Sequence, residues 1–405
     1  MADTARIIGG SVTAPRGFRA GSTSCGIKSD ANTKDLAALV SDVPCVAAAT
    51  FTTSKAPAAP VLVCKEHLVS SGFRAQGVLV NSGNANCSTG ERGMKDARTM
   101  AGILAQQFHF DEQLAMVSST GIIGRFLPIE KIISGAPAID PQYDGGEDFA
   151  GAIITTDTHP KKIALEFLVD NKTVRIGACV KGAGMIYPNM ATMLCYITTD
   201  AAIEQQWLQE TLRDCVEDSF NMIAVDGDMS TNDTVLVLAN GMAGNTPIAA
   251  GSPDAEIFAE SLRQITKYLA MEIARDGEGA TKLMEVRVSG AATDSDARKA
   301  ARAVTVSPLW QCALAGSDPN WGRIIAAVGA SGAVFDHNRL EISLGHILVV
   351  KNGLAADYAQ ADAKAAVSGK EVIISVNLHN GVAAATAWGC DLTHGYIDEN
   401  TTYTR

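Results

Sequence analysis

The sequence has no closely paired cysteines and no long apolar run, and its aromatic content is only 5%. The nine cysteines are scattered, are odd in number and nowhere have CxxC spacing, which favours reduced thiols over a disulfide framework or a zinc site. No apolar segment approaches the roughly 18 residues that span a bilayer. The first residues also lack the apolar core of a signal peptide. We therefore expect a cytoplasmic protein that contacts no membrane and binds no metal.

Basic residues are scarce relative to acidic ones. The chain has 33 Lys and Arg against 44 Asp and Glu, a formal charge of -11, which argues against a nucleic-acid partner because such a partner needs a basic face. Small anionic substrates remain compatible with this charge. No Walker or Rossmann motif is present, so we expect no bound cofactor. The 405 residues, 47% of them hydrophobic, can form two lobes or one large layered domain.

One stretch, residues 181–200, combines a strand entry with a candidate reactive residue. Lys181 is followed by Gly182 and Gly184, which let backbone or ligand approach closely. Pro188 restricts the chain, and Thr192 precedes an apolar segment that predicts a buried strand. The pattern can present the threonine hydroxyl as a nucleophile. A glycine-rich turn into a core strand is also a common structural feature, so the local sequence leaves both interpretations open.

Hydrophobic spacing predicts strands and helices on either side of this stretch. The apolar runs that we interpret as strands are 45–53, 60–64, 77–80, 162–169, 173–180 and 284–289. The segments that we interpret as helices are 90–108, 201–220 and 254–275. Two of the strands should form a hairpin about Asp170 and Asn171. The Asn/Gly-rich segment 81–86 follows a strand and suits a polar loop near a site.

Thr120 and Gly121 place a hydroxyl beside an unhindered backbone N–H. Such a pair can stabilise a developing oxyanion. A turn of serine, threonine and glycine is more often a plain loop, so the local sequence does not decide between the two.

Asp226 and Asp228 have the spacing of a calcium-binding loop. The sixth position of that loop is Thr231 where glycine is required, and the twelfth is Val237 where glutamate is required. We therefore reject calcium and expect a hydrogen-bonded wall of an active site, or a plain turn.

The run Lys181-Gly-x-Gly-Met-Ile-x-Pro-Asn-Met-Ala-Thr-Met-Leu resembles the signature of the glutamate/ornithine N-acetyltransferases of arginine biosynthesis. Further segments match the same family, so the resemblance covers most of the chain. Members of this family are self-cleaving enzymes of the N-terminal-nucleophile type. The resemblance implies an α/β fold, a layered sandwich of the ornithine acetyltransferase and aminopeptidase type in which helices pack on β-sheets.

The resemblance also implies that the Thr192 hydroxyl attacks the carbonyl of Ala191 and breaks the bond between them. The products would be an α-chain of residues 1–191 and a β-chain of residues 192–405, one functional unit that the family suggests assembles as α2β2. The new N-terminal threonine carries its own base, because an α-amino group has a pKa of roughly 7.7–8.0. Thr192 would then move an acetyl group from N2-acetylornithine to glutamate. Some similar sequences also use acetyl-CoA as a co-substrate.

By the same resemblance, Thr120 and Gly121 fall on the oxyanion-stabilising pair of the family. The residues that fall on its substrate contacts are Thr158, Lys181, Thr192, Glu278, Asn400 and Arg405. Arg405 departs from the threonine that is usual at that position. The charges of the two substrates suggest that Lys181 meets a carboxylate and Glu278 an ammonium group. On local sequence alone, Glu278 lies between two glycines in an exposed loop, where a carboxylate is usually only solvated.

Two other functions are compatible with these residues. An amidase or aminopeptidase on a related self-cleaving scaffold would release acetate or an amino acid without needing an acceptor. A non-catalytic amino-acid-binding protein would bind ornithine and remain uncleaved. The near-complete signature over residues 181–194 favours the acetyltransferase.

Overall fold

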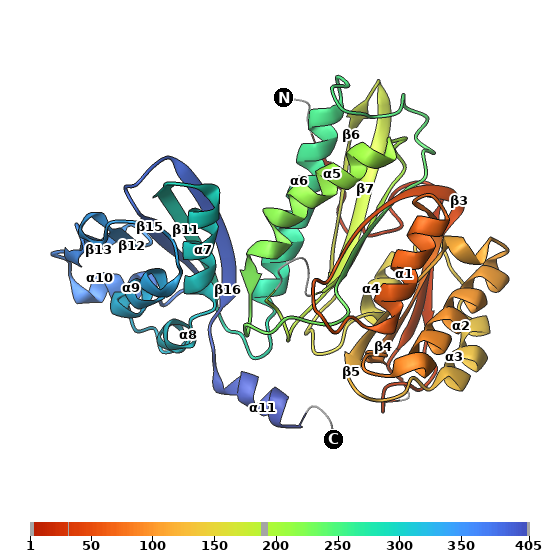
Figure 1. Cartoon of the computed structure of the whole chain (residues 1–405), viewed down its shortest axis with the longest axis horizontal. Coiled ribbons are helices and arrows are strands. Elements are labelled where there is room, and N and C mark those ends of the chain that lie inside the picture. Colours follow the sequence, from red (N-terminus) through yellow and green to blue (C-terminus); the bar gives the residue numbers. More distant parts are fainter. Residues whose placement is uncertain (1–3, 31, 188–192, 403–405) are drawn as a thin grey trace. The chain divides into compact units, whose positions relative to one another are not determined.

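The computed structural model describes residues 4–30, 32–187 and 193–402, and its contacts divide the chain into two compact units (Figure 1). The first unit comprises Met1–Gly182, Asn189–Val216 and Met229–Leu269. The second comprises Ala183–Pro188, Glu217–Asp228 and Ala270–Arg405. Of the two architectures that the length allows, the chain therefore adopts the one with two units.

The first unit is built on one mixed sheet, which has nine strands within the described residues. Their order is β1-β6-β7-β8-β10-β3-β4-β5, with β2 paired to β3 outside this path. The pairs β8–β10 and β4–β5 are parallel and the others antiparallel. The strands are β1 Ala5–Arg6, β2 Phe18–Thr23, β3 Leu36–Phe51, β4 Arg74–Asn84, β5 Ala115–Ile122, β6 Lys161–Val169, β7 Lys172–Lys181, β8 Leu194–Thr199 and β10 Thr234–Ala239.

Helices cover this sheet. The helices α1 and α2 pack on β5, and α4 packs on β2 and β3. Phe258 of α6 lies edge-on to Phe167 of β6, with ring centroids 6.2 Å apart, and also contacts Trp207 of α5. The helices are α1 Ala59–Ser70, α2 Gly90–Phe108, α3 Ile129–Gly135, α4 Gly146–Ala152, α5 Gln205–Glu217 and α6 Ala255–Arg275, the last two extending into the second unit.

The core of the first unit surrounds β8 and β10, in which every residue is buried. Strands covered on both faces are largely apolar rather than alternating, and these two are buried throughout although they include Thr198, Thr199 and Thr234. Tyr196 of β8 packs edge-on against Phe149, with ring centroids 5.2 Å apart. Because burying one large apolar side chain contributes about 1.5–3 kcal/mol, this packing holds the two strands firmly in the centre of the sheet.

The second unit has its own sheet, which contains seven strands in the part of the chain that the structure describes. The strand order is β14-β13-β12-β15-β11-β16-β9, and α7 packs on β11 and β16. The strands are β9 Ile223–Ala224, β11 Leu283–Ala291, β12 Glu341–Leu344, β13 Ile347–Lys351, β14 Leu354–Ala355, β15 Glu371–Asn377 and β16 Ala383–Cys390. The helices are α7 Asp294–Thr305, α8 Pro308–Ala315, α9 Trp321–Ala330, α10 Gln360–Ala366 and α11 His394–Thr402.

Most of the predicted elements are confirmed. The α/β class with helices packed on sheets is present, the helix over 90–108 is α2, and the predicted hairpin is β6–β7. Asp170 and Asn171 both have positive φ, 49° and 57°. Asparagine and aspartate tolerate this conformation better than other side chains, and two such residues in a row suit a tight hairpin turn.

The strand predicted over residues 60–64 is wrong, because these residues lie in the first turns of α1. Pro60 stands at the start of this helix, where its missing N–H costs nothing. A short apolar run does not distinguish a buried strand from a buried helix, and packing on β5 favours the helix here.

No helix among the described residues is both long and apolar enough to cross a membrane. Within the same residues, no three His, Cys, Asp or Glu side chains are grouped so that they could hold a metal ion.

Candidate active site

The two units carry different parts of the predicted site. Thr120, Gly121, Thr158 and Lys181 lie in the first unit, while Glu278 and Asn400 lie in the second. The remaining predicted residues lie outside the described residues: Ala191, Thr192 and Arg405.

Thr120 and Gly121 lie near the end of β5, and both are half-buried. Gly121 pairs with Gly83 of the neighbouring β4. It has a φ of 128°, and a Cβ at this position would lie 2.4 Å from the carbonyl carbon of Gly83. Backbone therefore occupies the space that a side chain would need, and only glycine fits. The same absence of a side chain leaves the Gly121 N–H unhindered by a Cβ of its own.

The Asn-rich end of β4 holds this part of β5 in place. The Asn81 carboxamide oxygen accepts a hydrogen bond from Ser119 Oγ at 2.6 Å. The Asn84 amide donates to the carbonyls of Arg125 and Phe126 at 3.3 and 3.1 Å. The first bond reaches Ser119, directly before the Thr120–Gly121 pair, and the others reach residues 125 and 126 after it. The prediction of a loop over residues 81–86 is wrong for residues 81–84, which continue β4, and the nearness of this segment to a site stays a prediction.

A row of paired residues connects Lys181 with the start of β8. Lys181 of β7 is opposite Leu194 of β8, which in turn is opposite Thr234 of β10. The Thr234 N–H donates to the carbonyl of Met193 at 2.9 Å. Met193 is the first described residue after Thr192. Met193, one residue beyond the predicted nucleophile, therefore lies beside β10.

Asn232, which the sequence did not indicate, connects this row with β5. It is 7% exposed, and its amide donates to the carbonyls of Ala85 at 2.6 Å and Ser119 at 2.8 Å. Because Thr234 lies two residues further along the chain, Asn232 links the neighbourhood of Met193 to the residue that precedes Thr120.

A buried charge cluster lies at the end of β7. The side chains of Asp157 and Lys161 are fully buried, with Lys161 Nζ 2.7 Å from Asp157 Oδ1. The Gly182 N–H donates to the same oxygen at 2.8 Å. Burial by itself raises the pKa of Asp157, but the charges of Lys181 and Lys161 and the Gly182 N–H outweigh burial and lower this pKa to about 2. Asp157 therefore stays ionised, with positive charge on both sides of it.

Thr158 follows Asp157 directly and is exposed, with its hydroxyl 3.0 Å from Nδ1 of His159. The buried carboxylate of Asp157 thus anchors the position of an exposed hydroxyl.

In the second unit, Glu278 is 8% exposed, so the prediction of an exposed, solvated carboxylate is wrong. Its backbone N–H donates to the carbonyl of Ala183 at 2.9 Å. A Cβ on Gly184 would lie 2.4 Å from the Glu278 carboxyl group. The glycine of the signature therefore lets the chain pass directly against this carboxylate, which explains how Glu278 becomes buried.

Asn400 of α11 reaches the same carboxylate. Its amide donates to Glu278 Oε2 at 2.8 Å and to the carbonyl of Tyr396 at 3.0 Å. Two predicted substrate contacts, which are far apart in the sequence, thus lie side by side in the second unit.

Asp226 is a second carboxylate at this place, and it was predicted only as part of a polar wall or plain turn. It accepts the N–H groups of Met185 and Ile186 at 2.6 and 2.9 Å. Burial raises the pKa of Asp226, and burial together with the negative charges of Asp226 and Glu278 raises the pKa of the Tyr396 hydroxyl. The segment is therefore hydrogen-bonded to the backbone of Met185 and Ile186, whereas its place in the wall of an active site stays a prediction.

Comparison with known proteins identifies the family. The ArgJ family model matches residues 19–405. The arginine biosynthesis bifunctional protein ArgJ of Symbiobacterium thermophilum is 50% identical over 401 residues, which cover 98% of this chain and 99% of the relative. The chain belongs to the ArgJ family. A second ArgJ protein, from Oceanobacillus iheyensis, is 44% identical and matches 97% of this chain and 96% of its own length.

A solved ArgJ structure, that of the bifunctional protein from Bacillus halodurans, agrees with this assignment. It is 44% identical with a TM-score of 0.51, and the match covers 52% of this chain and 100% of the crystallised one. The predicted family and type of fold are therefore confirmed, and the chain is an enzyme of arginine biosynthesis.

The match to the ArgJ family gives no role to four of the residues whose contacts are described above: Asn232, Asp157, Lys161 and Asp226. Each is a polar residue next to the end or start of a strand, which is a weak signal because such residues are common. The contacts of Asn232 and Asp226 are made over long sequence separations, so a local sequence pattern could not have singled them out. Asp157 and Lys161 are only four residues apart, and their pairing depends on local spacing.

Proposed function

We propose that the chain transfers an acetyl group from N2-acetylornithine to glutamate through an acetyl ester on Thr192. Membership of the ArgJ family supports acetyl transfer over the amidase and the non-catalytic alternatives. The first half-reaction would release ornithine. Attack of the glutamate amino group on the ester would then give N-acetylglutamate and free the threonine hydroxyl.

For maturation, we propose that the Thr192 hydroxyl attacks the carbonyl carbon of Ala191. The peptide C–N bond breaks, the nitrogen becomes the free α-amino group of Thr192, and water hydrolyses the resulting ester. Residues 1–191 and 192–405 would then be separate chains. In support, the complete crystallised chain from Bacillus halodurans is matched by only about half of this sequence, as expected for a family whose members consist of two chains of similar length.

Thr120 and Gly121 are proposed to stabilise the oxyanion in both reactions. The support is their place near the end of β5, where Asn84 and Asn232 bind backbone carbonyls and Asn81 binds the Ser119 hydroxyl. Met193, the neighbour of Thr192, accepts a hydrogen bond from Thr234 at the start of β10, two residues after Asn232. Donors that are fixed before the reaction stabilise developing charge without a cost of reorganisation.

Lys181 and Thr158 of the first unit and Glu278 and Asn400 of the second are proposed to contact the amino-acid substrates. Lys181 would favour a carboxylate, because it lies in a cluster where two lysines surround one aspartate. Glu278 would favour an ammonium group, and Asn400 would orient the Glu278 carboxylate through its 2.8 Å hydrogen bond. We propose that Arg405 makes a different substrate contact from that of the threonine that the family usually has at this position.

We further propose that the enzyme needs no bound cofactor, that acetyl-CoA serves as a second acetyl donor and that the chains assemble as α2β2 in the cytoplasm. The relatives are named bifunctional, which is consistent with two acetylation activities. All nine cysteines lie within the described residues and are free thiols, which suits a reducing compartment. Formation of N-acetylglutamate from glutamate and acetyl-CoA alone would support the second activity, and its absence would exclude it.

The intact mass of the denatured protein tests the nucleophile directly. The wild type should give two fragments that meet between Ala191 and Thr192, whereas Thr192→Ala should stay a single chain. The cleaved wild type should then convert N2-acetylornithine and glutamate to ornithine and N-acetylglutamate. A folded wild type that remains one chain would exclude the N-terminal amine as base and, with it, this mechanism.

A further inference from the structure

Asn232 makes an unusual set of contacts for one buried side chain. Its amide donates to the carbonyls of Ala85 and Ser119, which are 147 and 113 residues away in the sequence, and its carboxamide oxygen accepts from Thr231 Oγ1 at 2.6 Å. Both N–H groups of the amide therefore donate, one to a carbonyl directly after β4 and the other to a carbonyl within β5. One side chain joins the entry of β10 to the ends of β4 and β5.

These two carbonyls lie on either side of the Thr120–Gly121 pair. The Ser119 carbonyl belongs to the peptide unit whose N–H is that of Thr120, so the bond from Asn232 sets the plane of that peptide. Ala85 in turn donates its N–H to the carbonyl of Ile122 at 3.0 Å, immediately after Gly121. Asn232 thus holds the backbone directly before the pair and, through Ala85, directly after it.

The other end of this connection leads to the strand of the proposed nucleophile. Thr234, two residues after Asn232, donates to the carbonyl of Met193 and is paired with Leu194 of β8. The backbone that carries the oxyanion donors and the backbone that continues from Thr192 are therefore held through one short segment, residues 232–234, at the start of β10.

We propose that Asn232 is a positioning residue for the oxyanion pair, a role that rests on the function proposed above. Hydrogen-bond donors lower a barrier only when they are held within about 0.5 Å of the productive geometry, and a misplacement of roughly 1 Å can cost on the order of 100-fold in rate. Self-cleavage and acetyl transfer both form an oxyanion. Loss of the Asn232 amide should therefore slow both reactions while substrate binding is largely retained.

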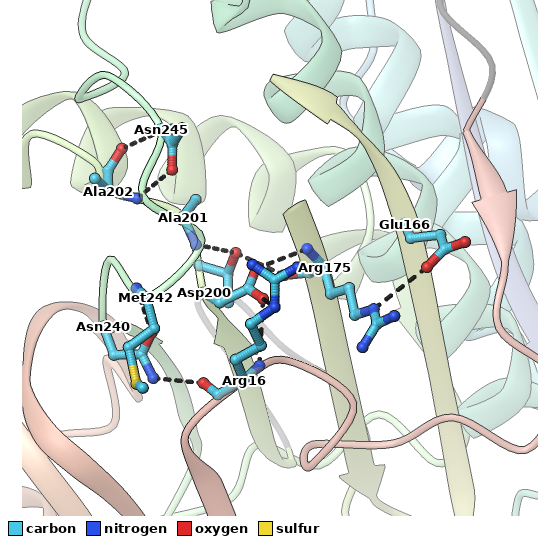
Figure 2. A network of polar contacts seen from close by, with 10 residues as sticks. Arg16, Glu166, Arg175, Asp200, Ala201, Ala202, Asn240, Met242 and Asn245 are labelled. Atoms are coloured by element: carbon cyan, nitrogen blue, oxygen red, sulfur yellow. Dashed lines mark hydrogen bonds and ion pairs between the residues drawn. The ribbon is translucent and has the colours of Figure 1, made fainter. Parts of the chain in front are cut away.

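Asn245 provides a matched control (Figure 2). It is 6% exposed, and its amide donates to the carbonyls of Ala202 at 3.1 Å and Thr246 at 2.8 Å. Ala202 lies just beyond the end of β8, whereas Asn232 acts at the opposite end of this six-residue strand, roughly 20 Å away at about 3.3 Å per residue. The two asparagines thus bind two carbonyls each, and only one of them is near the proposed site.

The test compares Asn232→Ala with Asn245→Ala in the complete chain. The measurements are the melting temperature, the half-time of self-cleavage, and kcat and KM per cleaved chain with N2-acetylornithine and glutamate. We expect similar losses of melting temperature in both variants. Only Asn232→Ala should lower kcat and the cleavage rate, each about tenfold or more, with KM changed less than about twofold.

Equal kcat and cleavage rates in the two variants would overturn the proposal and leave Asn232 a structural residue. Asn232→Ser, which keeps one donor of shorter reach, is measured in parallel in case the alanine variant does not fold. A folded serine variant with the kcat of the wild type would overturn the proposal as well. A wild type that neither cleaves itself nor transfers acetyl would instead contradict the proposed function, so the two failures are distinguishable.

Discussion

At the residue scale, Gly121 occupies a position where the surrounding backbone leaves no room for a side chain. Gly121→Ala would bring a Cβ to 2.4 Å from the Gly83 carbonyl carbon and 2.6 Å from the Asn84 nitrogen, at a φ of 128°. These neighbours are backbone atoms that cannot rotate away, so we expect a loss of about 1–3 kcal/mol in the free energy of unfolding. Urea unfolding measures this loss, and kcat should fall with it because Thr120 and Gly121 shift.

Gly251→Ala is the control for this prediction. Gly251 also has a positive φ, 76°, but no atom lies within 4 Å of the position of its Cβ. Any cost of this variant comes from the backbone conformation alone. If both alanine variants lose the same free energy, the close contact with β4 is not what requires glycine at position 121.

Asp157 gives a prediction about pH. Its pKa of about 2 lies below the ordinary value of 3.8, so the folded state binds a proton less readily than the unfolded state. The ionised carboxylate therefore stabilises the fold at pH values above 3.8, and this contribution, about 2 kcal/mol, is lost as the pH falls from 3.8 to 2. Asp157→Asn should lower the stability at neutral pH and flatten the dependence of the unfolding free energy over this interval.

The measurement is the urea midpoint from about pH 5 down to about pH 2, with Asp144→Asn, a substitution at an exposed carboxylate, as the control. That control should keep the slope of the wild type. A slope in Asp157→Asn equal to that of the wild type would mean that another carboxylate carries the pH dependence.

At the scale of elements, two neighbouring backbone N–H groups of the segment Ala183–Tyr187 bind the same carboxylate. Asp226 accepts the N–H groups of Met185 and Ile186, a few residues before the proposed cleavage site. Asp226→Ala leaves both donors without this acceptor, so the segment should loosen. We expect self-cleavage to slow about tenfold, because a bond that is not held in a reactive geometry is attacked less often.

The half-time of cleavage after synthesis measures this effect, and limited proteolysis at residues 183–187 reports the loosening. Asp228→Ala is the control, since Asp228 is exposed and contacts Asp226 through its backbone N–H. Unchanged cleavage in Asp226→Ala would show that the segment keeps its conformation without this carboxylate.

At the scale of the whole molecule, the sheet of the first unit predicts that the two chains remain associated after cleavage. β8 and β10 would belong to the second chain, and they lie between β7 and β3 of the first chain. Each of the two outer pairings extends over six residues, Lys181 to Ile176 with β8 and Val46 to Phe51 with β10. The cleaved chains should therefore stay together in native buffer and separate only in denaturant.

Size-exclusion chromatography of the cleaved protein, with denaturing electrophoresis of the fractions, measures this association. Both fragments should elute in one peak. Residues 1–191 expressed alone should aggregate, because the centre of the sheet would be missing and the edges of β7 and β3 would be unpaired. Separate elution of two folded fragments would contradict the prediction.

The sequence by itself determined those features that depend on a few neighbouring residues. Helical spacing of apolar residues predicted α2, the Asp170–Asn171 pair predicted the hairpin, and the run from Lys181 to Leu194 indicated the family. The strand predicted over residues 60–64 was wrong because a run of five apolar residues fits either a strand or a helix.

Only the tertiary structure decided which segments meet. Burial of Glu278 requires the backbone of Gly184, the charge of Asp157 depends on Lys181 and Lys161, and Asn232 reaches Ser119 across 113 residues. These contacts depend on the order of strands in a sheet, which the packing of the whole unit selects. A local sequence pattern specifies the element and the chemistry of a side chain, whereas the partner of that side chain is fixed only when distant strands pair.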